Sequence, residues 1–266
     1  MLDRAFGHPL PLEERATAPF AGGIMQHGYQ CGMIWGAALA AGAEAYRRLG
    51  PGADAEAAAV RAAQKVVQSF RKRHDEINCL EITDLDQSSS TWEMINYFIL
   101  KGGTVGCFRM ASWYAPRVLK AVESSFSEDG KPTPPAPVSC AALMARKAGM
   151  SECRSVMASG LAGGVGLCGG ACGALGAAVW ILAMRIAEVE DGKIGFKDPR
   201  TVELIDTFLE QTGFEFECSK ITGRCFEDVD DHAAYLRNGG CSELIERLAW
   251  ETTTSSRGGS PEDVED

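Results

Sequence analysis

Apolar residues recur at steps of three and four along most of the chain, which is the spacing of one face of an α-helix. The clearest case is the alanine-rich stretch Ala53–His74, which follows a Pro-Gly pair and ends in basic residues that suit a helix C-terminus. Alternating strand patterns are scarce, and the short stretch Phe214–Cys218 is the one strand candidate. The same helical spacing predicts further helices over Cys31–Arg48, Ser90–Leu100, Ala115–Ser124, Cys140–Lys147, Ser151–Gly160, Cys172–Val189, Pro199–Gln211 and Cys241–Glu251. The pattern therefore predicts a mainly α fold.

One segment interrupts this helical pattern. Ser125–Val138 contains four prolines, a glycine and a group of charges, so it cannot continue a helix. The end of the chain is polar and acidic, with few residues able to enter a core. We expect a first unit over residues 1–125, a proline-rich linker over 126–137, a second unit over 138–251 and a disordered acidic tail over 252–266.

A long uncharged stretch lies in the second unit, between Arg154 and Arg185. Its thirty residues exceed the roughly 20 that a membrane helix needs. However, eight of them are glycines and the mean hydropathy of the whole chain is −0.08, so buried helices are favoured over a membrane span.

The two units resemble each other. At a shift of 141 residues, seven of the seventeen positions in Ala21–Ala37 are identical to those in Ala162–Ala178. The similarity continues downstream, where FRKRHDEINCLEIT (70–83) is similar to FLEQTGFEFECSKIT (208–222). A repeat over this length indicates two related multi-helix units, which we expect to pack as a pseudo-dimer.

The repeat sorts the ten cysteines into two groups. Three pairs occupy equivalent places: Cys31 with Cys172, Cys79 with Cys218, and Cys107 with Cys241. Intervals of 48 and 28 residues in the first unit match intervals of 46 and 23 in the second. Cys153 and Cys225 have no counterpart. Cys168 aligns with His27. Either the two units exchange one metal ligand for another at this position, or His27 is a tolerated polar residue.

Charge and composition narrow the class of protein. The net charge of −10 and pI of about 5.0 leave no basic field for a phosphate backbone, so nucleic acid is not expected as a partner. The N-terminal stretch lacks an apolar signal region, which predicts a cytoplasmic protein. Lasting disulfides are rare there, so ten cysteines favour metal, cluster or redox chemistry over a disulfide framework. The sequence contains no CxxC, CxxCH or HExxH motif, no Walker loop and no GxSxG motif.

The second unit resembles the family described as redox-active and named for its C_GCAxxG_C_C motif. The residues that carry the resemblance are SCAALMARKAGM, GGVGLCGGACGALGAAV, FEFECSKITG and GGCSELIERLA, from about Val138 to Trp250. The resemblance places the four marker cysteines at Cys140, Cys172, Cys218 and Cys241. The closing glycine of the motif would fall on Ala177, with Gly176 one place early. The first unit resembles a truncated copy that has no counterpart of Cys140.

The resemblance implies a redox or electron-transfer protein. Its candidate roles include that of a component of an oxidoreductase. Its candidate partners are a redox partner protein and further copies of the same chain in a homo-oligomer. We expect an iron-sulfur cluster bound by Cys140, Cys172, Cys218 and Cys241, because cluster sites favour sulfur-only ligand sets. A second centre would use Cys31, Cys79 and Cys107, completed by His27 or by an outside group, and Cys168 is an accessory ligand candidate. Three alternatives stay open: a zinc site, a metal-free pair of redox thiols, and a structural or membrane-associated helical protein.

Overall fold

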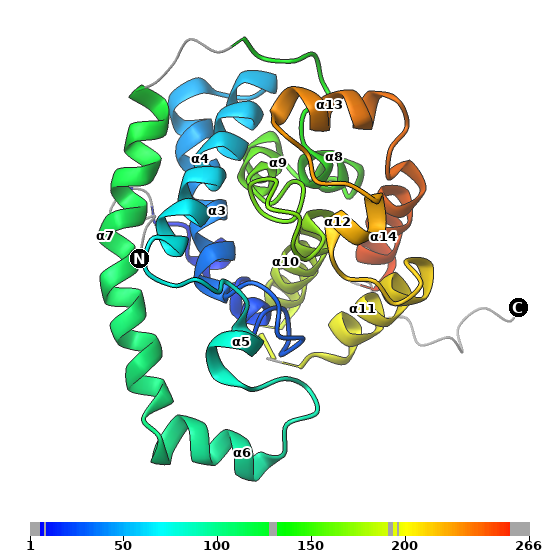
Figure 1. The fold of residues 1–266 in the computed structure, drawn as a ribbon. Helices are drawn as coiled ribbons and strands as arrows, with labels where there is room; N and C mark the ends of the chain where they lie inside the picture. The colour runs from blue at the N-terminus through cyan, green and yellow to red at the C-terminus, as the bar shows by residue number, and fades with distance from the viewer. Residues whose placement is uncertain (1–5, 8, 128–131, 191–193, 196, 256–266) are drawn as a thin grey trace, which may run out of the picture.

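The computed structural model describes residues 6–7, 9–127, 132–190, 194–195 and 197–255, and over these ranges the protein is built from helices without a β-strand (Figure 1). The predicted mainly α class is confirmed. The strand candidate Phe214–Cys218 is wrong, because Phe214 has a φ of 65° that breaks an extended strand and a helix begins at Cys218.

The first unit contains one long helical hairpin and several shorter helices. Alanine-rich sequences, which lose little side-chain entropy in a helix, form the two helices of the hairpin, α3 and α4. In chain order the helices are α2 (Pro11–Arg15), η1 (Ala18–Phe20), α3 (Gly32–Leu49), α4 (Ala53–Arg71), α5 (Cys79–Thr83), α6 (Thr91–Ile95), η2 (Asn96–Leu100) and α7 (Gly103–Ser127). Helix α7 is longer than the predicted Ala115–Ser124 at both ends and enters the first residues of the expected linker.

The second unit has helices in a corresponding order, preceded by α8, which has no counterpart among the described residues of the first unit. Its helices are α8 (Cys140–Lys147), α9 (Glu152–Ser159), α10 (Gly173–Val189), α11 (Pro199–Gln211), α12 (Cys218–Thr222), α13 (Val229–Arg237) and α14 (Ser242–Thr254). Four of them begin at a polar residue whose side chain accepts a hydrogen bond from a backbone N–H of the first turn: Ser139, Ser151, Asp198 and Asp228. Helix α14 includes the first residues of the expected tail, and residues 256–266 of that tail lie outside the described residues.

The helices of the two units interlock. Helix α3 packs against α4 of its own unit and against α9 of the other, while α10 packs against α8, α14 and α11. Figure 1 shows α10 in the interior and α7 along one edge of the molecule. Within the described ranges, no helix has both the length and the apolar character needed to cross a bilayer.

Equivalent residues of the two units meet at their interface. The side chain of Gln30 accepts a hydrogen bond from the backbone N–H of Ala171, its own repeat equivalent, at 3.0 Å. The indole of Trp35 lies against Gly176, also its equivalent, where an added Cβ would come within 2.1 Å of the ring. These contacts place a pseudo-two-fold axis between the units, as expected for a pseudo-dimer.

Candidate functional site

The glycine-rich run before Cys172 is a left-handed turn. Positive φ angles occur at Gly163, Gly164, Val165, Gly166, Leu167 and Gly169, and the equivalent positions of the first unit, Gly22 to Gln26 and Gly28, have them too. L-residues rarely adopt this conformation, which explains why glycines are concentrated in both runs. Because α10 begins only at Gly173, Cys168 and Cys172 do not share a helix face.

Each turn delivers a cysteine to the start of a helix. Cys172 is the N-cap of α10, and its N–H donates to the carbonyl of Phe216 at 2.8 Å. Cys218, the first residue of α12, donates its N–H to the carbonyl of Gly170 at 2.7 Å. In the first unit, Cys31 and Cys79 make the same bonds to Ile77 and Tyr29, at 2.8 and 2.7 Å. The repeat inferred from cysteine spacing is therefore present in the backbone geometry.

Two further cysteines of the second unit also lie at helix starts. Cys140 is the first residue of α8, and Cys241 is the N-cap of α14 with a φ of 59°. Together with Cys172 and Cys218 they line one closed cavity of about 20 Å³. Cys140, Cys172 and Cys218 are buried, at 7%, 6% and 7% exposed, and Cys241 is half-buried. The structure thus brings together the four cysteines that the sequence singled out.

Burial controls the protonation of these thiols. It raises the pKa of Cys172 to about 12 and that of Cys241 to about 11, and it raises the pKa of Cys140 and of Cys218 as well. Neighbouring thiols of the group add to the shift, whereas the backbone N–H groups of Leu175 and Ala174 oppose it at Cys172. At neutral pH the four cysteines of the protein alone are therefore uncharged thiols.

Three cysteines of the first unit line a different kind of cavity. Cys31, Cys79 and Cys107 lie around a space of about 600 Å³. Burial raises the pKa of Cys31 to about 12 and raises those of Cys79 and Cys107. Cys107 differs from its counterpart Cys241 because it lies inside α7, four residues after the start of that helix, rather than at the N-cap.

The two accessory candidates lie apart from these cavities. The thiol of Cys168 donates to the carbonyl of Gly164 at 2.7 Å, and Cys168 does not line either space. The ring of His27 packs on Phe216 of the second unit, with centroids 4.8 Å apart. Burial lowers the pKa of His27, which favours its neutral form. Of the two cysteines without an equivalent in the other unit, Cys153 is half-buried and Cys225 is exposed.

Other residues of the site escaped the sequence analysis. The hydroxyl of Tyr235 lies 3.8 Å from the sulfur of Cys241, and in the first unit the side chain of Tyr97 lies close enough to Cys107 to lower the pKa of that thiol. The Thr222 and Thr83 hydroxyls each donate to the carbonyl of the cysteine four residues earlier, at 2.7 Å. Both pairs recur at equivalent places, so aligning the units beyond the cysteines would have found them.

Cys241 lines both the small cavity of the four cysteines and a cleft at the surface. It lines an open cleft of about 680 Å³ together with Thr212, Lys220 and Tyr235. Across the described part of the chain, no three His, Cys, Asp or Glu side chains are arranged as a site that could hold a metal ion.

Comparison with known proteins agrees with the repeat. A family model described as "Putative redox-active protein (C_GCAxxG_C_C)" matches residues 1–115 and residues 137–254, which is consistent with two copies in tandem. No curated protein matches the chain, and no solved structure matches it.

Proposed function

Because the chain belongs to the C_GCAxxG_C_C family, whose description is redox-active, we propose that it is an electron-transfer protein whose redox centre is the four-cysteine cavity of the second unit. Family membership supports the redox role, and the residues of that role are our proposal. The proposed centre consists of Cys140, Cys172, Cys218 and Cys241.

The observation that carries the proposal is the convergence of four helix starts on one cavity. Each of the four cysteines is the N-cap or the first residue of its helix. Free backbone N–H groups at helix starts favour negative charge, which supports both thiolates and the sulfide of an iron-sulfur cluster. Four structurally unrelated cysteines would have no reason to share this position.

The donor set fits an iron-sulfur cluster by its chemistry. Four sulfurs form a complete ligand set, and the backbone N–H groups of Leu175 and Ala174 lower the pKa of Cys172, as donors around the ligands do in cluster sites. A cluster held by these residues would supply one-electron storage. The four thiols must lose their protons to become ligands, so we expect iron binding to release protons and to strengthen as the pH rises.

The size of the cavity favours a second candidate, a metal-free dithiol. A volume of about 20 Å³ is close to that of one water molecule, so the thiols lie close together in the protein alone. Two such thiols can form a disulfide and release two electrons and two protons. The cluster would use all four cysteines, and the disulfide would use two of them.

Electrons would leave through Cys241. It is the most exposed of the four, and it is the one that also lines the open cleft of about 680 Å³. We propose that a redox partner protein docks over this cleft.

Purification without oxygen, followed by iron and sulfide assays and an absorption spectrum, tests the proposal. We expect iron and acid-labile sulfide in wild-type protein, their loss in Cys172→Ser, and their retention in Cys153→Ser, a matched control at a cysteine that does not line the cavity. An iron-free protein that reversibly forms a disulfide among the four cysteines would replace the cluster with the dithiol. A protein with neither property would contradict the proposal.

A further inference from the structure

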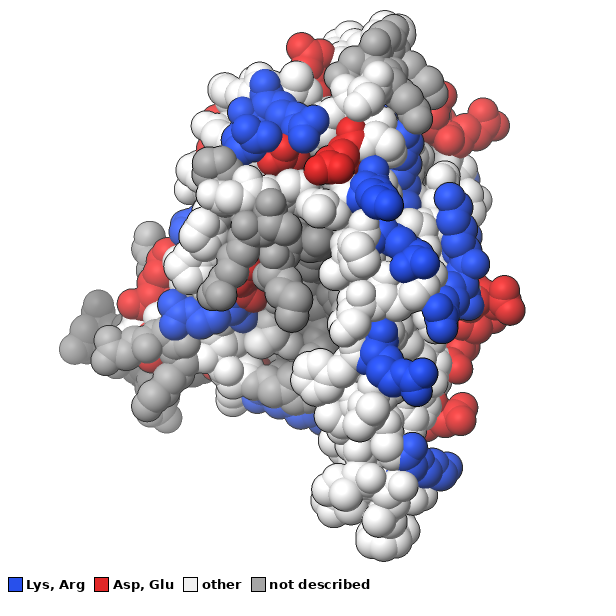
Figure 2. Space-filling model, turned by 90° about the vertical axis from the view of Figure 1, so that its left-hand side faces the viewer, with Lys and Arg blue, Asp and Glu red and all other residues white. Residues whose placement is uncertain are grey.

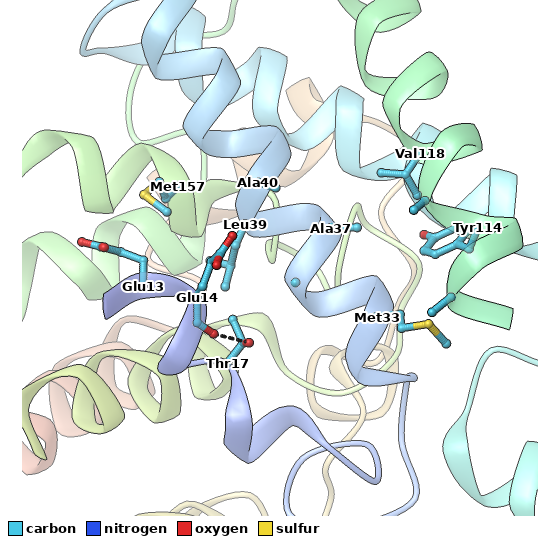
Figure 3. A pocket seen from close by; sticks show the side chains of 13 residues that line it. Glu13, Glu14, Thr17, Met33, Ala37, Leu39, Ala40, Tyr114, Val118 and Met157 are labelled. Atoms are coloured by element: carbon cyan, nitrogen blue, oxygen red, sulfur yellow. Dashed lines mark hydrogen bonds between the residues drawn. The ribbon is translucent and has the colours of Figure 1, made fainter. Parts of the chain in front are cut away.

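The two units differ most in the space beside their cysteines. In the second unit, α8 packs against α9, α10 and α14, and its first residue, Cys140, helps to close the cavity. In the first unit the equivalent helices are α2 with η1, α3 and α7, and the described residues provide no counterpart of α8 between them. A cavity of about 380 Å³ lies there instead, and Figure 3 shows Met33 and Ala37 of α3 opposite Tyr114 and Val118 of α7.

This cavity continues into the space beside the three thiols. Thr17, Met33 and Ala111 line both the cavity of about 380 Å³ and the one of about 600 Å³. Ligand pockets in proteins have volumes of about 300–1,000 Å³, whereas the closed cavity of the second unit, about 20 Å³, admits no more than a water molecule. The first unit therefore has room for a ligand where the second unit has a helix.

The lining of the larger cavity is apolar and uncharged. Side chains such as Met94, Phe98 and Phe108 surround the three cysteines, and no described residue that lines it carries a charged side chain. Phe98 and Phe108 are 38% and 69% exposed, so the opening to the surface is apolar as well. An apolar molecule would lose little solvation on entering, whereas an ion would lose much.

One polar group in this cavity has a poor partner. Gln26 is only 9% exposed, and its side-chain nitrogen donates to the sulfur of Met94 at 3.6 Å. A thioether is a weak acceptor, so a carbonyl oxygen would bind this nitrogen better.

We propose that the cavity of about 600 Å³ in the first unit binds an uncharged, mostly apolar carbonyl compound of the quinone class. The compound would lie beside Cys31, Cys79 and Cys107, with a carbonyl oxygen that accepts a hydrogen bond from the side-chain nitrogen of Gln26. The binding stands on the shape and lining of the cavity, and its purpose rests on the proposed redox function.

A quinone matches the chemistry of the three thiols. The lining around them is apolar and uncharged, so reactions that leave an ion in the cavity are disfavoured. When two thiols form a disulfide, two S–H bonds break, one S–S bond forms, and two electrons and two protons are released. A quinone takes up the two electrons and the two protons, and its two carbonyl oxygens become the hydroxyls of a quinol. The reaction therefore creates no charge in the cavity.

Duroquinone is a suitable probe because its fully methylated ring gives thiols no open carbon to add to. We expect one molecule to bind per full-length chain by equilibrium dialysis, and also in a variant with Cys31→Ser, Cys79→Ser and Cys107→Ser, which cannot reduce it. Ala111→Phe fills the junction of the two cavities and should weaken binding at least tenfold. Ala121→Phe, on the same helix but outside both linings, should leave binding unchanged.

A second variant guards against misfolding of Ala111→Phe. Gln26→Leu introduces the residue that the second unit has at the equivalent position, Leu167, with nearly the same backbone conformation, φ 65° against 61°. Loss of the amide donor should weaken duroquinone binding by about three- to tenfold, as expected for one neutral hydrogen bond. Absence of saturable binding, or wild-type affinity in both Ala111→Phe and Gln26→Leu, would overturn the inference. Binding without oxidation of any thiol would leave the inference standing and contradict a redox role for these three cysteines.

Discussion

At the scale of single residues, the interface between the units depends on a glycine that the family motif does not require. Gly176 leaves space for the ring of Trp35, which is fully buried and stacks on Phe20 with centroids 5.0 Å apart. The motif glycine in register belongs to the first unit, as Gly36, and an added Cβ there would meet no atom within 4 Å. The displaced glycine of the second unit is thus explained by contact between the units.

We therefore predict that the same substitution has different effects on stability at these two glycines. Gly176→Ala should lower the free energy of unfolding by about 1–3 kcal/mol, because the methyl group would displace Trp35 in a close-packed core. Gly36→Ala should leave stability unchanged or raise it by up to about 1 kcal/mol, since alanine is the better helix former. Urea unfolding curves measure both, and equal effects at the two positions would contradict the contact.

The sequence was informative about the cysteines and less so about their surroundings. Repeated spacing identified Cys172, Cys218 and Cys241 with their first-unit equivalents, and the family resemblance added Cys140. Spacing could not show that the turn before Cys172 is left-handed, because glycine is compatible with close helix packing, ligand approach and positive φ alike. It also could not show that Cys168 donates to a carbonyl of its own turn.

At the scale of elements, α8 determines how the two units differ. Besides Cys140 it carries Arg146, whose guanidinium pairs with Glu56 of α4 in the other unit and with Glu152 at 3.1 Å. The Glu56 side chain is 1% exposed, and one of its carboxylate oxygens has no hydrogen-bond partner. Burial raises the pKa of Glu56 although Arg146 opposes the shift.

Removing this arginine should be costly. Arg146→Ala would leave the Glu56 carboxylate buried without its ion-pair partner, which costs about 3–5 kcal/mol of unfolding free energy. Glu152→Gln, a change at the half-exposed partner of Arg146, should cost less than about 1 kcal/mol. Adding Glu56→Gln to Arg146→Ala should recover much of the loss.

The pH dependence of this effect has a definite sign. The pKa of Glu56 is higher in the folded chain than in the unfolded chain, so burial of this group costs stability as the pH rises above the ordinary Glu value of about 4.3. The loss caused by Arg146→Ala should therefore shrink as the pH falls toward that value and be smallest below it, where the carboxyl is protonated in both states. A loss that is the same at pH 4.5 and pH 7 would contradict a buried, charged Glu56.

Helix patterns were predictable where apolar residues recur at helical spacing over several turns, as in α3, α4 and α11, and where the apolar run is long, as in α10. Short elements such as α5 and α12 were not, because five residues are too few to show a helical period. The strand candidate failed because its first residue, Phe214, is 76% exposed and left-handed, and its last, Cys218, begins a helix.

At the scale of the whole molecule, the net charge lies in one part of the chain, whereas the packing is shared by both units. The first 127 residues contain 13 Lys and Arg and 13 Asp and Glu, so the net charge of −10 belongs to the rest of the chain. Figure 2 shows Lys and Arg gathered in a column on the face that α7 covers. If the partner protein docks over the Cys241 cleft of the acidic second unit, a basic docking face is expected on the partner.

The packing, in contrast, is shared between the units. Helix α9 packs on α3 and α4, and Gln30 bonds both Ala171 and the carbonyl of Gly164. Residues 138–254 expressed alone would expose these faces, so we predict that they lose cooperative thermal unfolding, whereas a chain of residues 1–254 keeps it. Circular dichroism melting curves measure this, and a sharp transition of the isolated half at the full-length temperature would argue against interlocked units.

The central claim is that the four cysteines at the helix starts of the second unit carry the redox activity. A coulometric titration under anaerobic conditions tests it most directly, because it counts the electrons taken up per chain whether a cluster or a disulfide accepts them. We predict that Cys153→Ser accepts as many electrons as the wild-type protein and that Cys172→Ser accepts fewer. A Cys172→Ser variant that titrates like the wild-type protein would contradict the account.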